Sequence, residues 1–446
     1  MSFSPEHLKL MIQPFSSAKV IWVAYSGGCD SHALLHSLVA LRAEIKAEIK
    51  AIHINHGLSP DADKWEAHCK QTCEQLNVSY SAIKVDARQK KSSPEEAARH
   101  ARYDEWKLLI KKNEIILLAH HQDDQAETLL LQLMRGSGVK GLAAMPAQQG
   151  FSQGLLCRPM LGFSREDIQH YAEKHNLSWI DDPSNFDTDF DRNFLRHQVV
   201  PLLESRWPSL KKTLSRTASH SAEADHLLSV LAEQDWQHVQ HAESAKQIKV
   251  SALLELDEMR QRNLLRYWLA SMCGLRLPNT VHLQRILDEV VTAADDASPE
   301  VIWNGGEVRR YRGLLYAQEV LCQVQSGESY TWSNIEQPLT VAKQRLLAVA
   351  ANGQGLSQEK LAGAEISVHF RQGGETCRPK GRGQTHQLKK LFQEWNIPPW
   401  QRASVPLLYV NNELAEVIGY CCCEPFAASD GEPSWSISQV NEDKFQ

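Results

Sequence analysis

Short apolar runs alternate with longer amphipathic stretches over the first part of the chain. The apolar runs are Val20–Tyr25, Ile49–Ile54, Val78–Val85 and Ile115–Ala119, and the stretches between them repeat apolar residues at helical spacing. Runs of this length predict buried strands, and strands that alternate with helices are typical of a parallel sheet. The pattern therefore predicts a doubly wound α/β domain with a mainly parallel sheet, whose ligands lie beyond the carboxyl ends of the strands.

The pattern changes after about residue 215. Residues 216–325 are expected to form a mainly helical, substrate-binding domain with strands only near its end. A polar stretch rich in Ser, Gln and Glu predicts a linker over 326–350, with an edge hairpin as the alternative. Short alternating runs beyond it predict a small α+β domain over 351–446. The expected organisation is thus a catalytic domain over 1–215 followed by these two smaller domains.

Composition narrows the class of protein. The chain has 446 residues and a formal net charge of −6, and it contains no apolar run near the ~20 residues that span a bilayer. Its ten cysteines are scattered and form no Cys-x-x-Cys pair, so a disulfide framework is not expected. We expect Cys69 and Cys73 to be buried thiols rather than a metal or redox site. A cytoplasmic protein without a membrane partner is expected.

The first strand runs into Ser26-Gly27-Gly28-Cys29-Asp30-Ser31, which precedes a predicted helix. Glycines let backbone N–H groups surround an anion, and the N-terminal end of a helix favours negative charge there. The Gly-x-x-x-x-Gly-Lys pattern of nucleoside triphosphatases is absent. The string instead resembles the loop of the ATP pyrophosphatase (PP-loop) superfamily. That resemblance implies that these six residues bind ATP and that Asp30 helps to hold Mg²⁺ on the departing pyrophosphate.

Later motifs distinguish members of this superfamily. In the first domain they are His53–Asp63, Pro94–Tyr103, Ala119–Thr128, Arg135–Leu142, Arg158–Met160, Asp181–Asn185 and Arg192–Arg196, and in the last domain they are Arg371–Glu375, Leu388–Phe392 and Pro398–Arg402. Together they resemble the tRNA(Ile)-lysidine synthetase family over nearly the whole chain, most weakly from about 216 to 365.

The resemblance implies an ATP-dependent ligase that modifies tRNA. ATP would adenylate the C2 oxygen of the wobble cytidine in the minor isoleucine tRNA, whose anticodon is CAU. The side-chain amine of free L-lysine would then displace AMP, giving lysidine. Enzymes of this kind often pair, so a homodimer is one expectation.

Five side chains are the candidates for catalysis. They are Asp30, Arg102, His120, Asp124 and Glu127. Adenylation develops negative charge on pyrophosphate, which Arg102 is placed to contact, with Arg99 one turn earlier as a second candidate. The alternative for both arginines is a solvated helix stripe paired with nearby glutamates.

The second step requires an amine without its proton. Asp124 and Glu127 lie three residues apart, on one face of a predicted helix that starts at the carboxyl edge of the sheet. We expect them to bind and orient the lysine amine, and one of them is a candidate general base. His120 is expected to contact ATP or to assist proton transfer. A metal site built on His120, His121 and Asp124 is the alternative.

A local basic surface is expected to hold the tRNA, although the chain as a whole carries a net negative charge. Its candidates in the last domain are Arg371, Arg378, Lys380, Arg382, Lys389, Lys390 and Arg402, opposed by only two glutamates between 371 and 402. Arg135 and Lys140 flank a Gly-rich loop in the first domain and are further candidates. Trp395 and Trp400 offer faces on which bases stack, or else they belong to the core.

A tRNA-thiolating member of the same superfamily is the nearest alternative function. It would need reactive cysteines or an iron–sulfur cluster, and the missing Cys-x-x-Cys pair counts against it. A small-molecule ligase would not need the basic C-terminal surface. A tRNA-binding protein without activity would not be expected to keep Ser26, Asp30 and Asp124.

Overall fold

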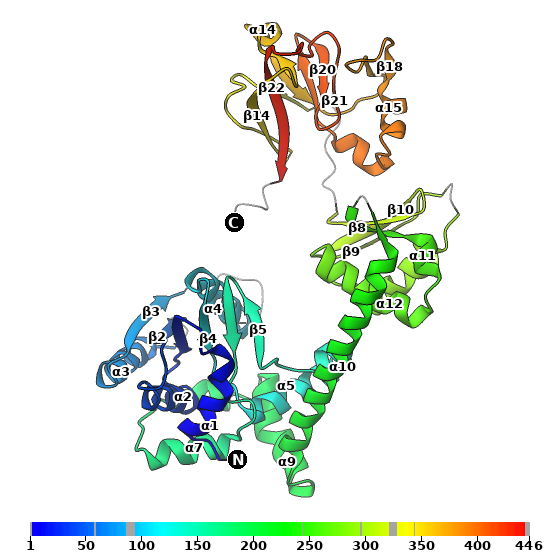
Figure 1. Cartoon of the computed structure of the whole chain (residues 1–446). Coiled ribbons are helices and arrows are strands. Elements are labelled where there is room, and N and C mark those ends of the chain that lie inside the picture. The colour runs from blue at the N-terminus through cyan, green and yellow to red at the C-terminus, as the bar shows by residue number, and fades with distance from the viewer. Residues whose placement is uncertain are drawn as a thin grey trace. The chain divides into compact units, whose positions relative to one another are not determined.

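The computed structural model describes residues 2–57, 59–85, 94–242, 244–294, 297–320, 328–342 and 344–441. The chain divides into two compact units, Met1–Leu231 and Ala232–Gln446 (Figure 1). Each unit has hydrophobic cores of its own. They are described separately below.

A six-stranded sheet forms the centre of the first unit, with the strand order β3-β2-β1-β4-β6-β5. The strands are β1 (Val20–Ala24), β2 (Glu48–Asn55), β3 (Ser79–Lys84), β4 (Glu114–Leu117), β5 (Gln148–Phe151) and β6 (Gly154–Cys157). All neighbours pair in parallel except the β5–β6 hairpin at the edge. The predicted doubly wound α/β domain is confirmed.

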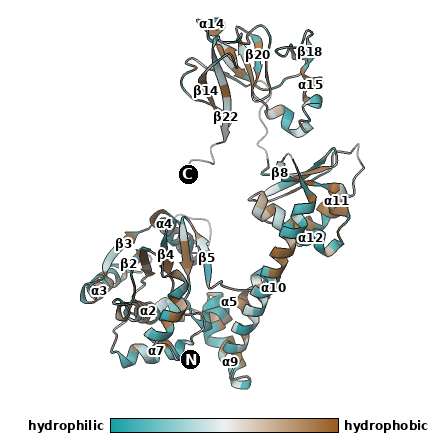
Figure 2. Cartoon of the chain, viewed as in Figure 1, coloured by the Kyte–Doolittle hydropathy of each residue, from teal (hydrophilic) through white to brown (hydrophobic). Residues whose placement is uncertain are grey.

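Helices cover both faces of this sheet because its strands are apolar on both sides. Ile21 and Val23 of β1 face a core made with α1 (Pro5–Ile12), α2 (Cys29–Ala40), α3 (Ala62–Gln75) and α7 (Arg165–Lys174). Val20 and Trp22 point the other way, toward α4 (Pro94–Leu109). Figure 2 shows the apolar colour on the strands and a more hydrophilic α7.

A further group of helices in the first unit begins after β4 and resumes after β6. It comprises α5 (Gln122–Met134), α6 (Val139–Leu142), the short helix η2 (Pro183–Phe186), α8 (Asp191–Phe194), the π-helical turn η3 (Leu195–Val199), α9 (Val200–Arg206) and α10 (Leu210–Val239). A small core around Leu130, Leu195 and Val200 packs α5 against η3 and α9. This packing fixes the acidic face of α5 relative to η3.

The expected domain boundary at 215/216 lies inside α10, a continuous helix of 30 residues. The helix continues past that point, and the division between the two units falls at Leu231/Ala232, also within it.

Among the described residues, no helix combines the length and the apolar character needed to cross a bilayer.

The second unit begins with helices packed on an antiparallel sheet. Helices α11 (Val250–Leu254), α12 (Glu258–Tyr267), η4 (Trp268–Met272), α13 (Thr280–Arg285) and η5 (Ile286–Val291) accompany β7 (Gln240–His241), β8 (Ser244–Lys249), β9 (Glu300–Trp303), β10 (Gly306–Tyr311) and β11 (Leu314–Gln318). Trp268 is fully buried and Trp236 nearly so in their shared core. The predicted helices are present, and they pack on a sheet. Of its strands, β9, β10 and β11 lie near the end of the region, where strands were expected.

The rest of the second unit is mainly antiparallel sheet. Its strands are β12 (Ser329–Thr331), β13 (Leu339–Val341), β14 (Gln344–Asn352), β15 (Leu356–Ser357), β16 (Ile366–His369), β17 (Thr376–Cys377), β18 (His386–Gln387), β19 (Leu407–Val410), β20 (Glu413–Val417), β21 (Cys421–Cys422) and β22 (Pro433–Asn441), with helices α14 (Gln358–Leu361), α15 (Leu388–Glu394) and η6 (Pro399–Ser404). This agrees with the predicted small α+β domain.

The linker expected over 326–350 is wrong for the described residues of that range. They contribute β12, β13 and most of β14, and β14 pairs with β22 from Gln344↔Asn441 to Asn352↔Pro433. Polar composition was misleading because these strands bury only a few side chains, among them Val341 and Leu346. The alternative of an edge hairpin describes β13 and β14 better.

Glu416 of β20 is a buried carboxyl, and its burial predicts that the stability of this sheet depends on pH. It is 6% exposed, and its Oε2 atom has no hydrogen-bond partner among the described residues. Burial raises the pKa of Glu416 from 4.5 to about 8. Between these two values the folded state keeps a proton that the unfolded state releases, so stability falls as pH rises.

We expect the free energy of unfolding to fall by about 4 kcal/mol between pH 4.5 and 8, and we expect this fall to be absent in Glu416→Gln. Hydrogen exchange of the β19–β21 amides, corrected for intrinsic rates and measured at pH 5.5 and 8, checks it. Glu413→Gln, an exposed glutamate on the same strand, is the control that should keep the pH dependence. An equal fall in Glu416→Gln contradicts the assignment.

Candidate active site

The phosphate-binding loop lies between β1 and α2. Gly27 has φ +87°, a backbone conformation that favours glycine, and Gly28 is the N-cap of α2. The backbone N–H of Ser26 donates to Ser31 Oγ at 3.2 Å, and Ser31 Oγ donates to the Gly28 carbonyl at 3.0 Å. Ser31 is therefore engaged in shaping the loop, and the backbone N–H groups at the start of α2 remain the natural anion donors.

The loop is also held from outside. The N–H of Ile180 donates to the Gly27 carbonyl at 3.0 Å. A Cβ atom at Gly27 would meet Cys69 Sγ at 2.9 Å and Ile180 Cδ1 at 3.0 Å. Close packing thus leaves Gly27 no room for a side chain.

His121 connects this loop to the acidic start of α5. Its Nε2 atom lies 3.6 Å from Asp30 Oδ2 and 3.4 Å from Asp124 Oδ2, and its Nδ1 atom lies 3.8 Å from Asp123 Oδ1. His121 is also the N-cap of α5, and its backbone N–H donates to Asp124 Oδ2 at 3.0 Å. Burial lowers the pKa of His121, but the carboxylates of Asp124 and Asp30 outweigh burial and raise it above its ordinary value.

Asp30 has one oxygen to offer a cation. Its Oδ1 atom is buried and has no hydrogen-bond partner among the described residues. Within that same part of the chain, no three His, Cys, Asp or Glu side chains are grouped so that they could hold a metal ion. Mg²⁺ commonly binds through one or two carboxylates while phosphate oxygens and water complete its shell. The donor set at Asp30 fits this mode of binding.

Asp124 and Glu127 lie together, as their spacing predicted, and both are ion-paired with two arginines. Arg192 reaches Asp124 Oδ1 (Nη2, 2.9 Å) and Glu127 Oε2 (Nε, 2.7 Å). Arg196 reaches Glu127 Oε1 (Nε, 2.7 Å) and Oε2 (Nη2, 2.9 Å). The Glu127 side chain is only 3% exposed. Burial alone would raise the pKa of Asp124, but His121 and Arg192 outweigh it and hold that pKa below its usual range.

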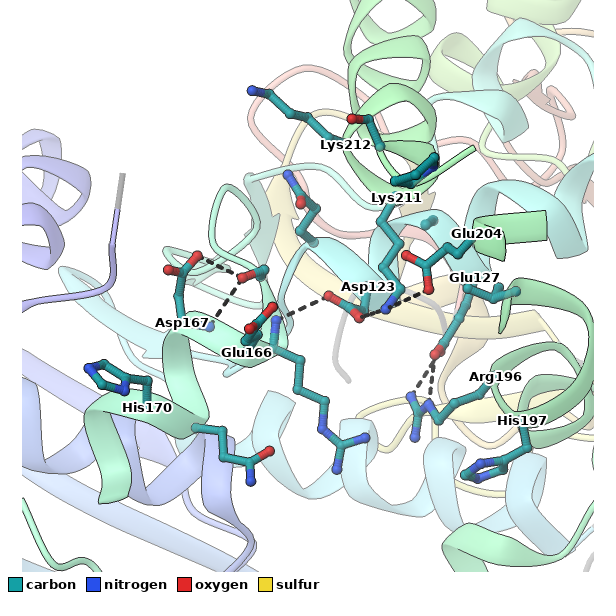
Figure 3. A pocket seen from close by; sticks show the side chains of 18 of the residues that line it. Asp123, Glu127, Glu166, Asp167, His170, Arg196, His197, Glu204, Lys211 and Lys212 are labelled. Carbon is teal, nitrogen blue, oxygen red and sulfur yellow. Dashed lines mark hydrogen bonds and ion pairs between the residues drawn. The ribbon is translucent and has the colours of Figure 1, made fainter. Parts of the chain in front are cut away.

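A cleft of about 990 Å³ opens beside this network (Figure 3). It is lined by residues of α5, α7, η3, α9 and α10 and by neighbouring loop residues, and not by the phosphate loop. Its walls carry both signs of charge: Arg165, Arg196, Lys211 and Lys212 face Asp123, Glu127, Glu166 and Glu204. Lys211 Nζ pairs with Asp123 Oδ2 at 2.7 Å. A ligand with both charges, such as an amino acid, suits these walls.

Two further candidates are His120, which follows β4, and Arg102, which lies on α4. Arg158 Nε donates to His120 Nδ1 at 3.3 Å. Burial, assisted by nearby arginines, lowers the pKa of His120 to about 3. His120 is therefore neutral at physiological pH and a weak base, which favours contact with the nucleotide over proton transfer. Arg102 is close enough to His56 to help burial lower the pKa of that histidine to about 4.

The cysteines of this unit are not poised for sulfur chemistry. Cys69, Cys73 and Cys157 are buried, and Cys29 of the phosphate loop is half-buried. Burial raises the pKa of Cys29, Cys69 and Cys73 to about 12 and that of Cys157 to about 11. Since the thiolate is the nucleophile, these thiols are unreactive at neutral pH.

Most of the candidate tRNA-binding residues are exposed. These are Arg135, Lys140, Arg378, Lys380, Arg382, Lys389 and Lys390, while Arg371 is half-buried. Arg402 is an exception, because it is 8% exposed and its Nε donates to the Ile397 carbonyl at 2.9 Å. Its assignment to the tRNA surface is therefore wrong, because the buried side chain of Arg402 stabilises the start of η6.

Trp395 stacks on Tyr420 with ring centroids 5.3 Å apart, and Trp400 packs edge-on against Tyr311 and Tyr316.

The sequence did not single out the partners of the acidic pair. Arg192 and Arg196 lie within one of the family motifs, but the sequence indicated no role for them or for Lys211, and it indicated His121 only as a ligand of the alternative metal site. The available signal was the spacing: two arginines four residues apart match two acids three residues apart, so each pair presents one face of a helix.

The chain is similar to known proteins along nearly all its length. Residues 3–203 match the family model described as the PP-loop domain, 248–316 the TilS substrate binding domain, and 366–439 the TilS substrate C-terminal domain. The tRNA(Ile)-lysidine synthase of Coxiella burnetii (strain RSA 493 / Nine Mile phase I) is 43% identical over 437 residues, covering 98% of this chain and 96% of that protein. The protein of that name from Legionella pneumophila (strain Paris) is 41% identical over 421 residues, covering 94% and 95%.

Proposed function

The chain belongs to the tRNA(Ile)-lysidine synthase family, and from that premise we propose that it joins free L-lysine to C2 of the wobble cytidine in the CAU-anticodon isoleucine tRNA. ATP is its energy source and is cleaved to AMP and pyrophosphate. One observation supports the proposal above the others. Asp30 of the phosphate loop and Asp124 of α5 both lie within 3.6 Å of His121, so a phosphate site and an amine site adjoin.

Adenylation takes place at the phosphate loop. The wobble oxygen at C2 attacks the α-phosphorus, and the bond to pyrophosphate breaks. Backbone N–H groups at the start of α2 stabilise the charge that develops on the leaving phosphates. Asp30 would hold Mg²⁺, which neutralises pyrophosphate charge when it is bound. Arg102, on α4, is proposed as a further phosphate contact.

Ligation uses the acidic start of α5. The lysine amine attacks C2 and the bond to AMP breaks, so that AMP carries away the former C2 oxygen. Because the pKa of Asp124 is held below its usual range, this carboxylate orients an ammonium group better than it removes a proton. The mixed charges of the adjoining cleft suit the amino and carboxylate groups of free lysine.

Incorporation of labelled lysine tests the function. The full chain is incubated with ATP, Mg²⁺ and an unmodified CAU-anticodon isoleucine tRNA transcript, and in parallel with a transcript whose wobble base is U. We expect incorporation only with cytidine, together with release of AMP and pyrophosphate. ATP cleavage that depends on tRNA but incorporates no lysine contradicts the proposal and favours another nucleophile, with sulfur donors tested first.

The exposed lysines of α15 are proposed to contact the tRNA backbone. Replacing Lys389 and Lys390 together by Gln should weaken tRNA binding and reduce the slope of log affinity against log salt by about 1 to 2. Filter binding at several salt concentrations measures this slope. Lys107→Gln, which removes an exposed lysine of α4 paired with Asp104 at 3.1 Å, is the control. An unchanged slope in the double variant places the backbone contacts elsewhere.

Two further expectations stay predictions. We propose that the reaction takes place in the cytoplasm, where its tRNA is found. The homodimer expected from the family resemblance is tested by light scattering coupled to size-exclusion chromatography of the full chain.

A further inference from the structure

Every oxygen of the acidic pair on α5, Asp124 and Glu127, already accepts a hydrogen bond. Glu127 Oε1 accepts from Arg196, Oε2 accepts from both Arg192 and Arg196, and Asp124 Oδ1 accepts from Arg192. Asp124 Oδ2 accepts the N–H of His121. Because each carboxylate oxygen can accept more than one hydrogen bond, a lysine ammonium would have to share these oxygens with both arginines as long as the arginines keep their contacts.

The charges of this network already balance. Two carboxylates face two guanidinium groups, and Glu127 is almost fully buried. A third cation brought to the pair would leave the site with an excess of buried positive charge, which is costly. Binding of lysine therefore requires that one arginine turn to another anion.

The positions of Arg192 and Arg196 allow either guanidinium group to leave the carboxylates and pair with another anion. Their side chains keep exposed fractions of 26% and 23%, and Arg196 lines the open cleft (Figure 3). They are carried by α8 and the π-helical turn η3, and π-helical turns are frequent at functional sites. A phosphate group accepts a guanidinium in the same two-pronged geometry as a carboxylate, so it is a suitable alternative partner.

We propose that Arg192 and Arg196 act as a charge latch on the lysine site, and that a phosphate group of the bound nucleotide releases this latch. The path for this coupling is short, because Asp30 of the phosphate loop, His121 and Asp124 are consecutive neighbours. Lysine then binds after ATP, and the carboxylates are freed only when an activated base is being prepared. This inference rests on the proposed function and adds an order of binding to it. Both arginines are positioning residues, since they act through Asp124 and Glu127.

Calorimetric titration of L-lysine tests the latch. The full-length protein is titrated alone and in the presence of Mg²⁺, unmodified tRNA and an ATP analogue with a methylene group between the α and β phosphates. We expect lysine to bind at least about tenfold more tightly in the second case. In Arg192→Gln and Arg196→Gln, binding without the analogue should strengthen and the difference should shrink. Arg206→Gln, an exposed arginine of α9, should behave as the wild type.

The outcomes separate the latch from the function. Equal lysine affinity with and without the analogue, in a wild-type protein that incorporates lysine into tRNA, overturns the latch and leaves the proposed function intact. A wild type that incorporates no lysine overturns the proposed function itself. The wild-type comparison needs no variant, so it stays decisive if an arginine variant is unstable, and Arg192→Lys then offers a charge-preserving substitute.

Discussion

Gly27→Ala is expected to lower the rate of tRNA-dependent ATP–pyrophosphate exchange by about 100-fold or more, because misplacing reacting groups by roughly an ångström costs that much. The residue has φ +87°, which an alanine adopts only with strain. The new Cβ atom would also lie 2.9 Å from Cys69 Sγ and 3.0 Å from Ile180 Cδ1. The loop must shift to relieve this contact, and its N–H groups then no longer converge on the phosphates.

Gly274→Ala is the matched control for this variant. Gly274 also has a positive φ, +69°, but nothing lies within 4 Å of its added Cβ atom. The Gly274→Ala variant should therefore have the backbone strain but no steric clash of the new Cβ atom. Gly274 also lies outside the first unit. An exchange rate in Gly27→Ala close to that of Gly274→Ala would show that the loop tolerates the side chain and does not require the observed geometry.

Glu127→Gln is expected to reduce lysine incorporation by about 100-fold or more. The amide removes one of two negative charges that face Arg192 and Arg196, and it donates where the carboxylate accepted. The half-buried arginines are left with excess positive charge, which repels the lysine ammonium. ATP–pyrophosphate exchange measured with tRNA but without lysine should change much less, since the phosphate loop keeps all its residues.

Glu48→Gln provides the comparison for Glu127→Gln, because Glu48 forms an exposed ion pair with Lys50 at the start of β2. It should leave both activities unchanged. Thermal unfolding of each variant verifies that the fold survives. Equal losses of exchange and of incorporation in Glu127→Gln would contradict a role confined to the lysine step.

The sheet of the first unit was predictable because its strands are buried on both faces. Val20 to Tyr25 forms a continuous apolar run, and such runs between helical stretches have few alternatives to a parallel strand. The hairpin β13–β14 was only the alternative to a linker, because its strands bury few side chains and their sequence therefore resembles a linker.

The site was predictable only where its residues are close in sequence. The phosphate loop and the pair Asp124 and Glu127 belong to short motifs whose local geometry follows from spacing. The contact of Arg192 with Glu127 joins residues 65 positions apart, and nothing local indicates it. Arg402 was expected on the tRNA surface because the sequence shows that an arginine is charged. The sequence does not show that this side chain is buried.

The fate of the C2 oxygen tests the central claim most directly. A tRNA transcript that carries oxygen-18 at C2 of the wobble cytidine is converted with ATP and lysine by the full-length protein, and the released AMP is analysed by mass spectrometry. If the base is adenylated at C2 and lysine displaces AMP, the isotope is recovered in AMP. Unlabelled AMP, with the isotope retained in the tRNA or released as water, would contradict the adenylated intermediate and with it the roles assigned to the phosphate loop and the acidic pair.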